Sequence, residues 1–201
     1  MPPTGRRPTD EELLDGARAV FAERGYRAAG MAEVARRAST TKPTLYAHFG
    51  SKESLYLQLF DREADALRNH LFAVYDTMPI DDVGIMTRTA LNAGMAYVAT
   101  HPDGFRVLMA TGEPGNPASA SFRRLIETFV DRVALIVDAD VARRGLSTQP
   151  ASIRTVAAMM VASGLEAARQ GILVDGLSAQ HAADIAAVYM AGGLSSIDEL
   201  R

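Results

Sequence analysis

Apolar residues recur at intervals of three and four along almost the whole chain, which is the period of an amphipathic α-helix. Runs that alternate apolar and polar residues, as half-buried strands require, are nearly absent. The first helical run spans residues 10–24, and its apolar positions are Leu13, Leu14, Ala17, Val20 and Phe21. The pattern predicts an all-α protein.

The boundaries of the first predicted helix carry recognisable signals. Thr9 and Glu12 have the spacing of a capping box, in which each side chain satisfies a backbone N–H of the other residue. Gly25 follows Arg24, and glycine adopts the left-handed conformation that often ends a helix. We therefore expect this helix to begin near Asp10 and to end at Arg24.

Two short helices are predicted next, at residues 31–38 and 42–49, separated by a turn at residues 39–41. Thr41 is the expected N-cap of the second of these. Pro43 follows in the first turn, where a missing N–H costs nothing because the N–H groups there have no intrahelical partner. Gly50 is the expected end of this helix.

The rest of the chain predicts six further helices. Pro79, His101-Pro102, the Gly/Pro-rich linker GEPGNP and Gly145 separate them. The expected ranges are 51–74, 81 or 82 to 100, 103–110, 122–144, 151–173 and 178–197. About nine helices result, in a compact module at 1–56 and a larger helical domain at 57–201.

Composition narrows the class of protein. The chain has 201 residues and no cysteine, so disulfides and thiolate metal sites cannot contribute to it. It contains no apolar run of about 18 residues and no signal-peptide pattern. We expect a cytoplasmic protein that neither crosses nor binds a membrane.

The formal net charge of −3 is unevenly distributed along the chain. Residues 1–56 contain nine basic and seven acidic side chains, and the stretch 24–52 contains six basic side chains against Glu33 alone. A local basic excess of this kind attracts polyanions. The alternative is an ordinary solvated basic face.

The helices at 31–38 and 42–49 fit a helix-turn-helix, whose second helix enters the major groove of DNA. Leu45 and Phe49, with part of Tyr46, would pack inward. The opposite face and the N-terminal end carry polar groups that suit phosphates and base edges: Thr40, Thr41, Lys42, Thr44 and His48. The alternative is a helical hairpin with no DNA partner.

From about Thr9 to Phe60 the sequence resembles the DNA-binding domain of the TetR family of bacterial transcriptional regulators. The resemblance rests on the segments FAERGY, MAEVARRA and TKPTLYAHFGSKESL, about a quarter of the chain. The chain departs from the usual family pattern at Gly30, Ser39, Thr40 and Pro43.

The resemblance assigns roles to individual residues. It implies that Thr41, Tyr46 and Lys52 contact phosphates. It also implies that a second group lies in or near the major groove: Lys42, Pro43, Thr44, Ala47 and His48. The bound molecule would be double-stranded DNA.

The last two predicted helices are rich in alanine and glycine, which lets helix axes approach closely. The resemblance implies that these helices form a four-helix bundle with their twofold mates in a homodimer. The expected interface residues are Val156, Met160, Ser163, Ala167, Ile185, Val188, Tyr189 and Gly192. Alternatively, these faces pack within one subunit.

A small-molecule effector would need an apolar pocket in the larger domain. Candidate lining residues are Tyr97, Phe105, Met109, Phe122, Phe129, Met159 and Met160, all of which suit a core equally well. No catalytic constellation stands out, since His181 and Asp184 lack a third metal ligand within reach by sequence. We expect neither an enzyme nor a cofactor.

Together these features predict a homodimeric, ligand-responsive repressor. The resemblance implies the mechanism, in which a small hydrophobic molecule would release the protein from a palindromic operator by favouring a conformation whose recognition helices no longer match the two half-sites. The alternatives are an activator and a small-molecule binding protein of the same fold without an operator of its own.

Overall fold

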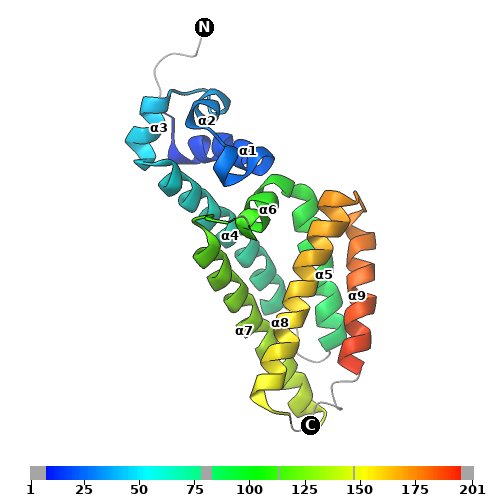
Figure 1. The fold of residues 1–201 in the computed structure, drawn as a ribbon. Coiled ribbons are helices and arrows are strands. Elements are labelled where there is room, and N and C mark those ends of the chain that lie inside the picture. The colour runs from blue at the N-terminus through cyan, green and yellow to red at the C-terminus, as the bar shows by residue number, and fades with distance from the viewer. Residues whose placement is uncertain (1–7, 78–82, 113, 147, 196–201) are drawn as a thin grey trace. The chain divides into compact units, whose positions relative to one another are not determined.

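The computed structural model of the chain describes residues 8–77, 83–112, 114–146 and 148–195 (Figure 1). These residues form nine α-helices, one 3₁₀ turn and one π-helical segment, and they contain no strand. The prediction of an all-α fold is therefore confirmed. Contacts divide the chain into two compact units, Met1–Ala64 with Asp103–Phe122, and Asp65–Pro102 with Arg123–Arg201. The domain boundary after residue 56 stays a prediction.

The first unit is built around three short helices and the helix that follows them. The elements are α1 (Asp10–Ala28), α2 (Met31–Arg37), α3 (Lys42–Phe49), the first half of α4 (Lys52–Asp76), most of α6 (Pro102–Met109) and the 3₁₀ turn η1 (Ala110–Gly112). Their most deeply buried side chains are Leu13, Val20, Phe21, Val34, Leu45, Leu55, Tyr56, Leu59, Phe60 and Phe105. The apolar stripe predicted for α1 is the face that enters this core.

The predicted start of α1 is confirmed, and its end needs a correction. The Thr9 hydroxyl accepts from the Glu12 N–H at 3.3 Å, and the Glu12 carboxylate accepts from the Thr9 N–H at 2.9 Å, which completes the capping box. Gly25 has a positive φ of 70° with ψ of 173°, which is not the left-handed helical cap that we expected. The chain kinks at Gly25 and continues as helix to Ala28.

A buried polar network connects α4 to the segment that follows α6. The Tyr56 hydroxyl donates to the Val107 carbonyl at 3.4 Å and accepts from the Asn116 side-chain amide at 3.0 Å. Asn116 also donates to the Ala110 carbonyl and accepts from the Ala118 N–H. This asparagine is only 5% exposed, so the predicted linker GEPGNP contributes to the interior of the first unit.

A charged network holds α1 against α4. The Arg62 guanidinium contacts Glu11 at 2.9 Å, Asp15 at 3.1 Å and Glu63 at 2.7 Å. Glu63 is 5% exposed and also faces Arg18 at 3.6 Å, so two cations accompany its buried carboxylate. Burial lowers the pKa of Arg62, but its bonds to Glu63 and Glu11 outweigh that effect and raise the pKa above the ordinary value.

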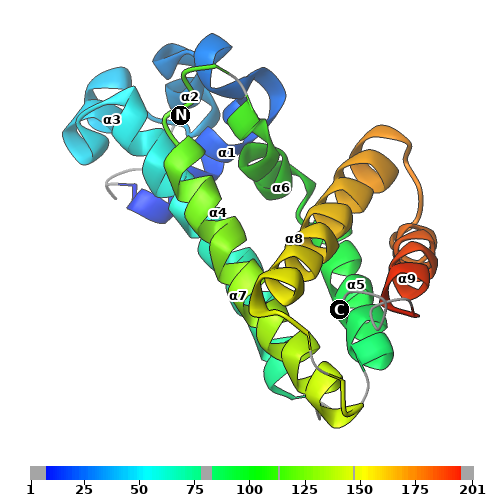
Figure 2. The same cartoon turned by 60° about the horizontal axis from the view of Figure 1, so that its bottom comes forward.

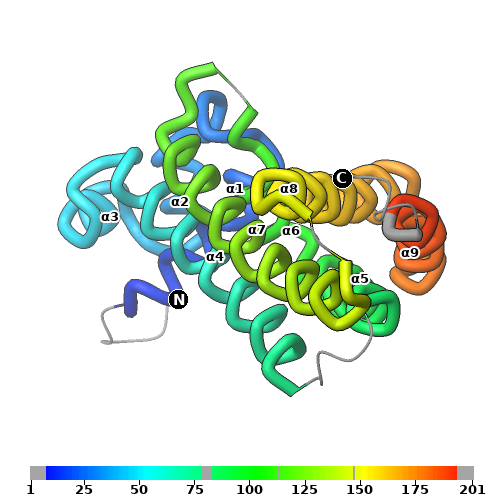
Figure 3. The backbone as a smooth tube through the Cα atoms, turned by 90° about the horizontal axis from the view of Figure 1, so that it is seen from below, coloured from blue at the N-terminus to red at the C-terminus, as the bar shows by residue number. Residues whose placement is uncertain are grey.

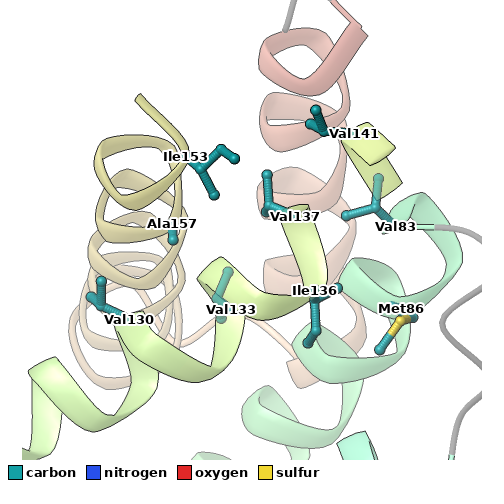
Figure 4. Packing of buried hydrophobic residues seen from close by; sticks show 9 residues of the cluster. All are labelled: Val83, Met86, Val130, Val133, Ile136, Val137, Val141, Ile153 and Ala157. Carbon is teal, nitrogen blue, oxygen red and sulfur yellow. The ribbon is translucent and has the colours of Figure 1, made fainter. Parts of the chain in front are cut away.

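The second unit consists mainly of long helices. It contains the second half of α4, α5 (Val83–Thr100), α7 (Ser119–Arg143) from residue 123, α8 (Pro150–Ala167), the π-helical segment η2 (Ala168–Val174) and α9 (Ala179–Ser195). Its core cluster joins α5, α7 and α8 and consists of Val83, Met86, Val130, Val133, Ile136, Val137, Val141, Ile153 and Ala157 (Figure 4). The predicted start of α5 at 81 or 82 and the predicted end of α9 at 197 lie outside the described residues.

In the second unit α9 lies beside α5 and α8 (Figures 2 and 3). The chain reaches α9 through η2, where the regular helix predicted for 151–173 changes at Ala168 into a wider π-helix. A Cβ on Gly171 would lie 3.2 Å from the Ala182 Cβ, so the absence of a side chain lets η2 and α9 approach closely.

Candidate nucleic-acid interface

A short turn connects α2 to α3. Ser39 has a φ of 50°, a left-handed conformation that serine can adopt, and the Thr40 N–H donates to the Ala35 carbonyl at 2.8 Å. Gly30 is the N-cap of α2 without a side-chain hydrogen bond. The departures from the family pattern at these positions therefore leave the helix-turn-helix geometry intact.

The start of α3 is organised by threonine side chains. The Thr41 hydroxyl accepts from the Thr44 N–H at 3.3 Å and lies 2.9 Å from the Thr44 hydroxyl, so the predicted N-cap is confirmed. Pro43 occupies the first turn, and Gly50, with φ of 73°, ends the helix as predicted. These local interactions limit α3 to eight residues.

The two faces of α3 differ in chemistry. Leu45 and Phe49 are buried, as the sequence predicts. Tyr46 is 45% exposed, so its ring is divided between the protein and solvent. The exposed residues of the predicted DNA-binding set are Thr41, Lys42, Pro43, Tyr46, Ala47 and His48, whereas Thr40, Thr44 and Lys52 are partly buried.

Close packing of α1 on α2 sets the position of this motif. A Cβ on Gly16 of α1 would lie 2.5 Å from the Cβ and 2.6 Å from the Cα of Ala38, the residue that ends α2. Real Cβ atoms do not approach other heavy atoms so closely, so only glycine fits here. Gly16 thus permits the contact from which the turn into α3 departs.

Ion pairs neutralise part of the basic excess in residues 24–52. Arg37 of α2 makes two contacts of 2.8 Å with Glu23 of α1, and Arg24 of α1 contacts Glu33 of α2 at 2.8 Å. These crossed pairs join the two helices. Within the described part of the chain, Arg27 and Lys42 have no acidic partner, and they remain available to a polyanion.

Lys52, the first residue of α4, contacts the end of α1. Its ammonium donates to the Arg27 carbonyl at 3.2 Å and lies 4.8 Å from the centre of the Tyr26 ring. This location satisfies a carbonyl at the helix terminus and adds a cation–π contact. Burial lowers the pKa of the Lys52 ammonium. The predicted phosphate ligand therefore also joins α4 to α1.

The residues predicted to line an effector pocket belong to both units. Phe105 is 1%, Phe129 4% and Tyr97 8% exposed, so these three side chains are buried. Met109, Phe122 and Met160 are partly buried, and Met160 packs against the core cluster of the second unit. Met159, by contrast, is 60% exposed on α8.

The residues predicted for the dimer interface divide between exposed and partly buried positions. On α9, Ile185, Val188, Tyr189 and Gly192 are exposed. On α8, Val156, Met160, Ser163 and Ala167 are partly buried, and Val156 packs with Met160 against the core cluster.

Asp184, a candidate metal ligand in the sequence, instead contacts Arg88 at 3.6 Å and Gln180 at 3.0 Å.

Among the described residues, no helix has the length and apolarity needed to cross a bilayer, and no three side chains of the metal-binding types gather in one place.

Comparison with known proteins decides the family. The profile described as "Bacterial regulatory proteins, tetR family" matches residues 13–59, which include the helix-turn-helix. The HTH-type transcriptional activator FasR of Mycolicibacterium smegmatis is 33% identical over 168 residues, which cover 82% of this chain and 74% of FasR. The chain belongs to the TetR family.

Solved structures show that the TetR fold extends over both units. A TetR-like transcriptional regulator from Rhodococcus sp. RHA1 aligns with a TM-score of 0.77 at 21% identity, over 94% of this chain and 99% of that protein. FadR from Bacillus subtilis, a transcriptional regulator solved in complex with stearoyl-CoA, aligns with a TM-score of 0.75 at 13% identity, over 92% of this chain and 99% of FadR.

Sequence patterns did not reveal two residues that organise this TetR helix-turn-helix. Gly16 lies inside a helix, where glycine ordinarily only weakens the structure, and Asp10 appeared only as the expected first residue of a helix. Asp10 contacts His48 of α3 at 2.6 Å. No local signal marks either contact, because the partners are 22 and 38 residues away along the chain.

Proposed function

We propose that this TetR-family regulator is a homodimeric, ligand-responsive repressor that binds a palindromic operator through α3 of each copy. The observation that carries the proposal is the two-faced α3, which buries Leu45 and Phe49 and exposes Lys42 and His48. Its capped N-terminus presents the hydroxyls of Thr41 and Thr44, which suit phosphates. Arg27 adds a cation without an acidic partner among the described residues.

The exposed face of α9 supports the proposal that the protein pairs with a second copy of itself. Ile185, Val188 and Tyr189 are 51%, 70% and 67% exposed, whereas the inner face of α9 consists largely of alanine and packs against α5. A helix whose exposed side chains are larger and more apolar than its buried ones normally packs against another protein surface. Met159, 60% exposed on α8, would extend the same surface. A second copy related by a twofold axis would cover both helices.

A twofold dimer dictates the form of the operator. Two recognition helices related by the axis would contact half-sites of opposite orientation, about one helical turn or a multiple of it apart, ~34 Å per turn. We expect a selection from randomised duplexes with the full chain to enrich an inverted repeat. A selection that enriched no sequence would instead favour the small-molecule binding protein without an operator.

An apolar effector is favoured by the candidate pocket residues that are buried in the second unit, Tyr97 and Phe129. Stearoyl-CoA is the first probe, because FadR from Bacillus subtilis has the same fold and binds it. We expect stearoyl-CoA to weaken operator binding by roughly 5- to 150-fold, a typical coupling between two sites. Fluorescence anisotropy of a labelled operator measures this change. Free CoA is the control, and an equal effect of CoA alone would refute an apolar effector.

Activation is the second candidate direction of control. FasR, which is similar to this chain over both units, is named as an activator. In vitro transcription from a promoter that carries the selected operator separates the two directions. Repression predicts fewer transcripts when the protein is added, and recovery with effector. More transcripts upon addition of the protein alone would support activation.

A further inference from the structure

A short side-chain bond joins the recognition helix to the start of α1. The Nδ1 atom of His48 lies 2.6 Å from the Oδ1 atom of Asp10, although the two residues are 38 positions apart. This distance is at the short end of the range for bonds in which one partner is charged. Asp10 itself is well placed, since the capping box between Thr9 and Glu12 orders the same turn.

The bond determines which nitrogen of His48 faces away from the protein. A carboxylate only accepts hydrogen bonds, so the proton of this contact must reside on Nδ1. The ring orientation and tautomer are then set by Asp10, as a second residue often sets those of a functional histidine. The Nε2 atom has no partner among the described residues.

We propose that Asp10 is a positioning residue for base selection, acting through His48. The inference rests on the proposed function, in which α3 enters the major groove. With Nδ1 bonded to Asp10, Nε2 has one defined role for a given charge: acceptor when the ring is neutral and donor when it is protonated. In the major groove an acceptor pairs with the amino groups of cytosine or adenine, and a donor pairs with guanine N7 or O6, adenine N7 or thymine O4. Without Asp10 the ring would rotate and exchange tautomers, so Nε2 would no longer be restricted to one hydrogen-bonding role and the base preference would weaken.

The same contact contributes little to folding. An ion pair of this exposed kind is worth little to stability, because solvent screens it. The packing of α3 depends on Leu45 and Phe49, which are buried without involving Asp10. Replacement of Asp10 should therefore leave the helix-turn-helix folded and change only what His48 presents to DNA.

The test is a selection from randomised duplexes, followed by measurement of the preference at each base position. Four versions of the full chain are compared with wild type: Asp10→Ala, His48→Ala, the double variant and Glu12→Gln. Glu12→Gln is the matched control, since it removes one negative charge from the same turn while glutamine retains the capping box. Thermal melts establish that each variant is folded.

We expect Asp10→Ala to reduce the base preference at one symmetry-related pair of positions by about fivefold, the factor that one hydrogen bond of ~1 kcal/mol provides. His48→Ala should reduce it at the same pair, and Asp10→Ala should add nothing in the His48→Ala background. Glu12→Gln should leave every position unchanged in preference.

Three results would overturn the inference while leaving the proposed function in place. They are an unchanged preference profile for Asp10→Ala, a uniform change in affinity that Glu12→Gln reproduces, and an effect of Asp10→Ala that persists without His48. A wild-type chain that enriched no sequence would overturn the proposed function, and this inference with it.

Discussion

Replacement of Gly16 by alanine tests whether close contact between α1 and α2 positions the helix-turn-helix. The new Cβ would lie 2.5 Å from the Cβ, 2.6 Å from the Cα and 2.8 Å from the N of Ala38. Two of these three atoms belong to the backbone, so no side-chain rotation relieves the overlap. The end of α2 would have to move away from α1.

The expected magnitude combines two opposing terms. Alanine is better than glycine inside a helix by ~1 kcal/mol. Overpacking of a tight contact costs ~1–3 kcal/mol, and the upper end applies because the backbone itself must shift. We expect Gly16→Ala to lower the free energy of unfolding by about 2 kcal/mol, which corresponds to a fall in Tm of ~4–8 °C for a chain of this size.

Circular dichroism at 222 nm during thermal or urea unfolding measures this loss, since the chain has no tryptophan. Two other helix glycines are matched controls. A Cβ on Gly94 would lie 3.5 Å from Leu71 Cδ2, and one on Gly164 would lie 3.6 Å from Leu91 Cδ2, both ordinary contacts. Gly94→Ala and Gly164→Ala should therefore stabilise the protein by up to ~1 kcal/mol.

The functional consequence of Gly16→Ala follows from the location of Ala38. This residue ends α2 and begins the turn into α3, so its displacement would move the recognition helix. We expect weaker operator binding by Gly16→Ala even where the variant is fully folded, and normal binding by Gly94→Ala. A Gly16→Ala variant that melted at or above the wild-type temperature would refute the packing argument.

Three further predictions concern substitutions of single residues. Lys52→Ala should weaken binding to all DNA sequences and lower the slope of log affinity against log salt by about one. It should also reduce stability, because the contact with the Arg27 carbonyl is lost. A change in sequence preference alone would contradict the assignment of Lys52 as a phosphate ligand. Thr41→Ala should cost ~1 kcal/mol in urea unfolding because it removes the cap of α3, whereas Thr41→Ser should be nearly neutral. Val188→Asp should convert the proposed dimer to monomer in sedimentation velocity, whereas Leu135→Asp, at an equally exposed position on α7, should leave the mass unchanged.

Features that depend on neighbours along the chain were predictable from the sequence. The capping box of Thr9 and Glu12, the Thr41 cap and the glycine stop at Gly50 all involve partners within four residues. The apolar period likewise identified the buried faces of α1 and α3, because burial follows helix geometry directly. This same local order points to Thr40, Thr41, Lys42, Thr44 and His48 as candidate DNA-binding residues, and the remaining candidates come from the resemblance to the TetR family.

Local sequence signals did not predict contacts between segments that lie far apart along the chain. The basic excess of residues 24–52 is reduced by Glu23, which lies outside that window and meets Arg37 only because α1 and α2 cross. Similarly, Gly25 interrupts α1 without ending it, and Lys52 bonds to a carbonyl just beyond the kink. Asn116 looked like a linker residue, yet it is buried because Tyr56 and Ala110 supply its hydrogen bonds.

By itself, the sequence determined that this protein is a set of amphipathic helices, where most of them begin and end, and that α3 has one apolar and one polar face. These properties arise from hydrogen bonds and side-chain spacing within one or two helical turns. Only the tertiary structure decided that Gly16 must be glycine, that Asp10 contacts His48 and that Lys52 bonds to the end of α1. Each of these contacts joins segments 22 to 38 residues apart, and packing, not local propensity, brings them together.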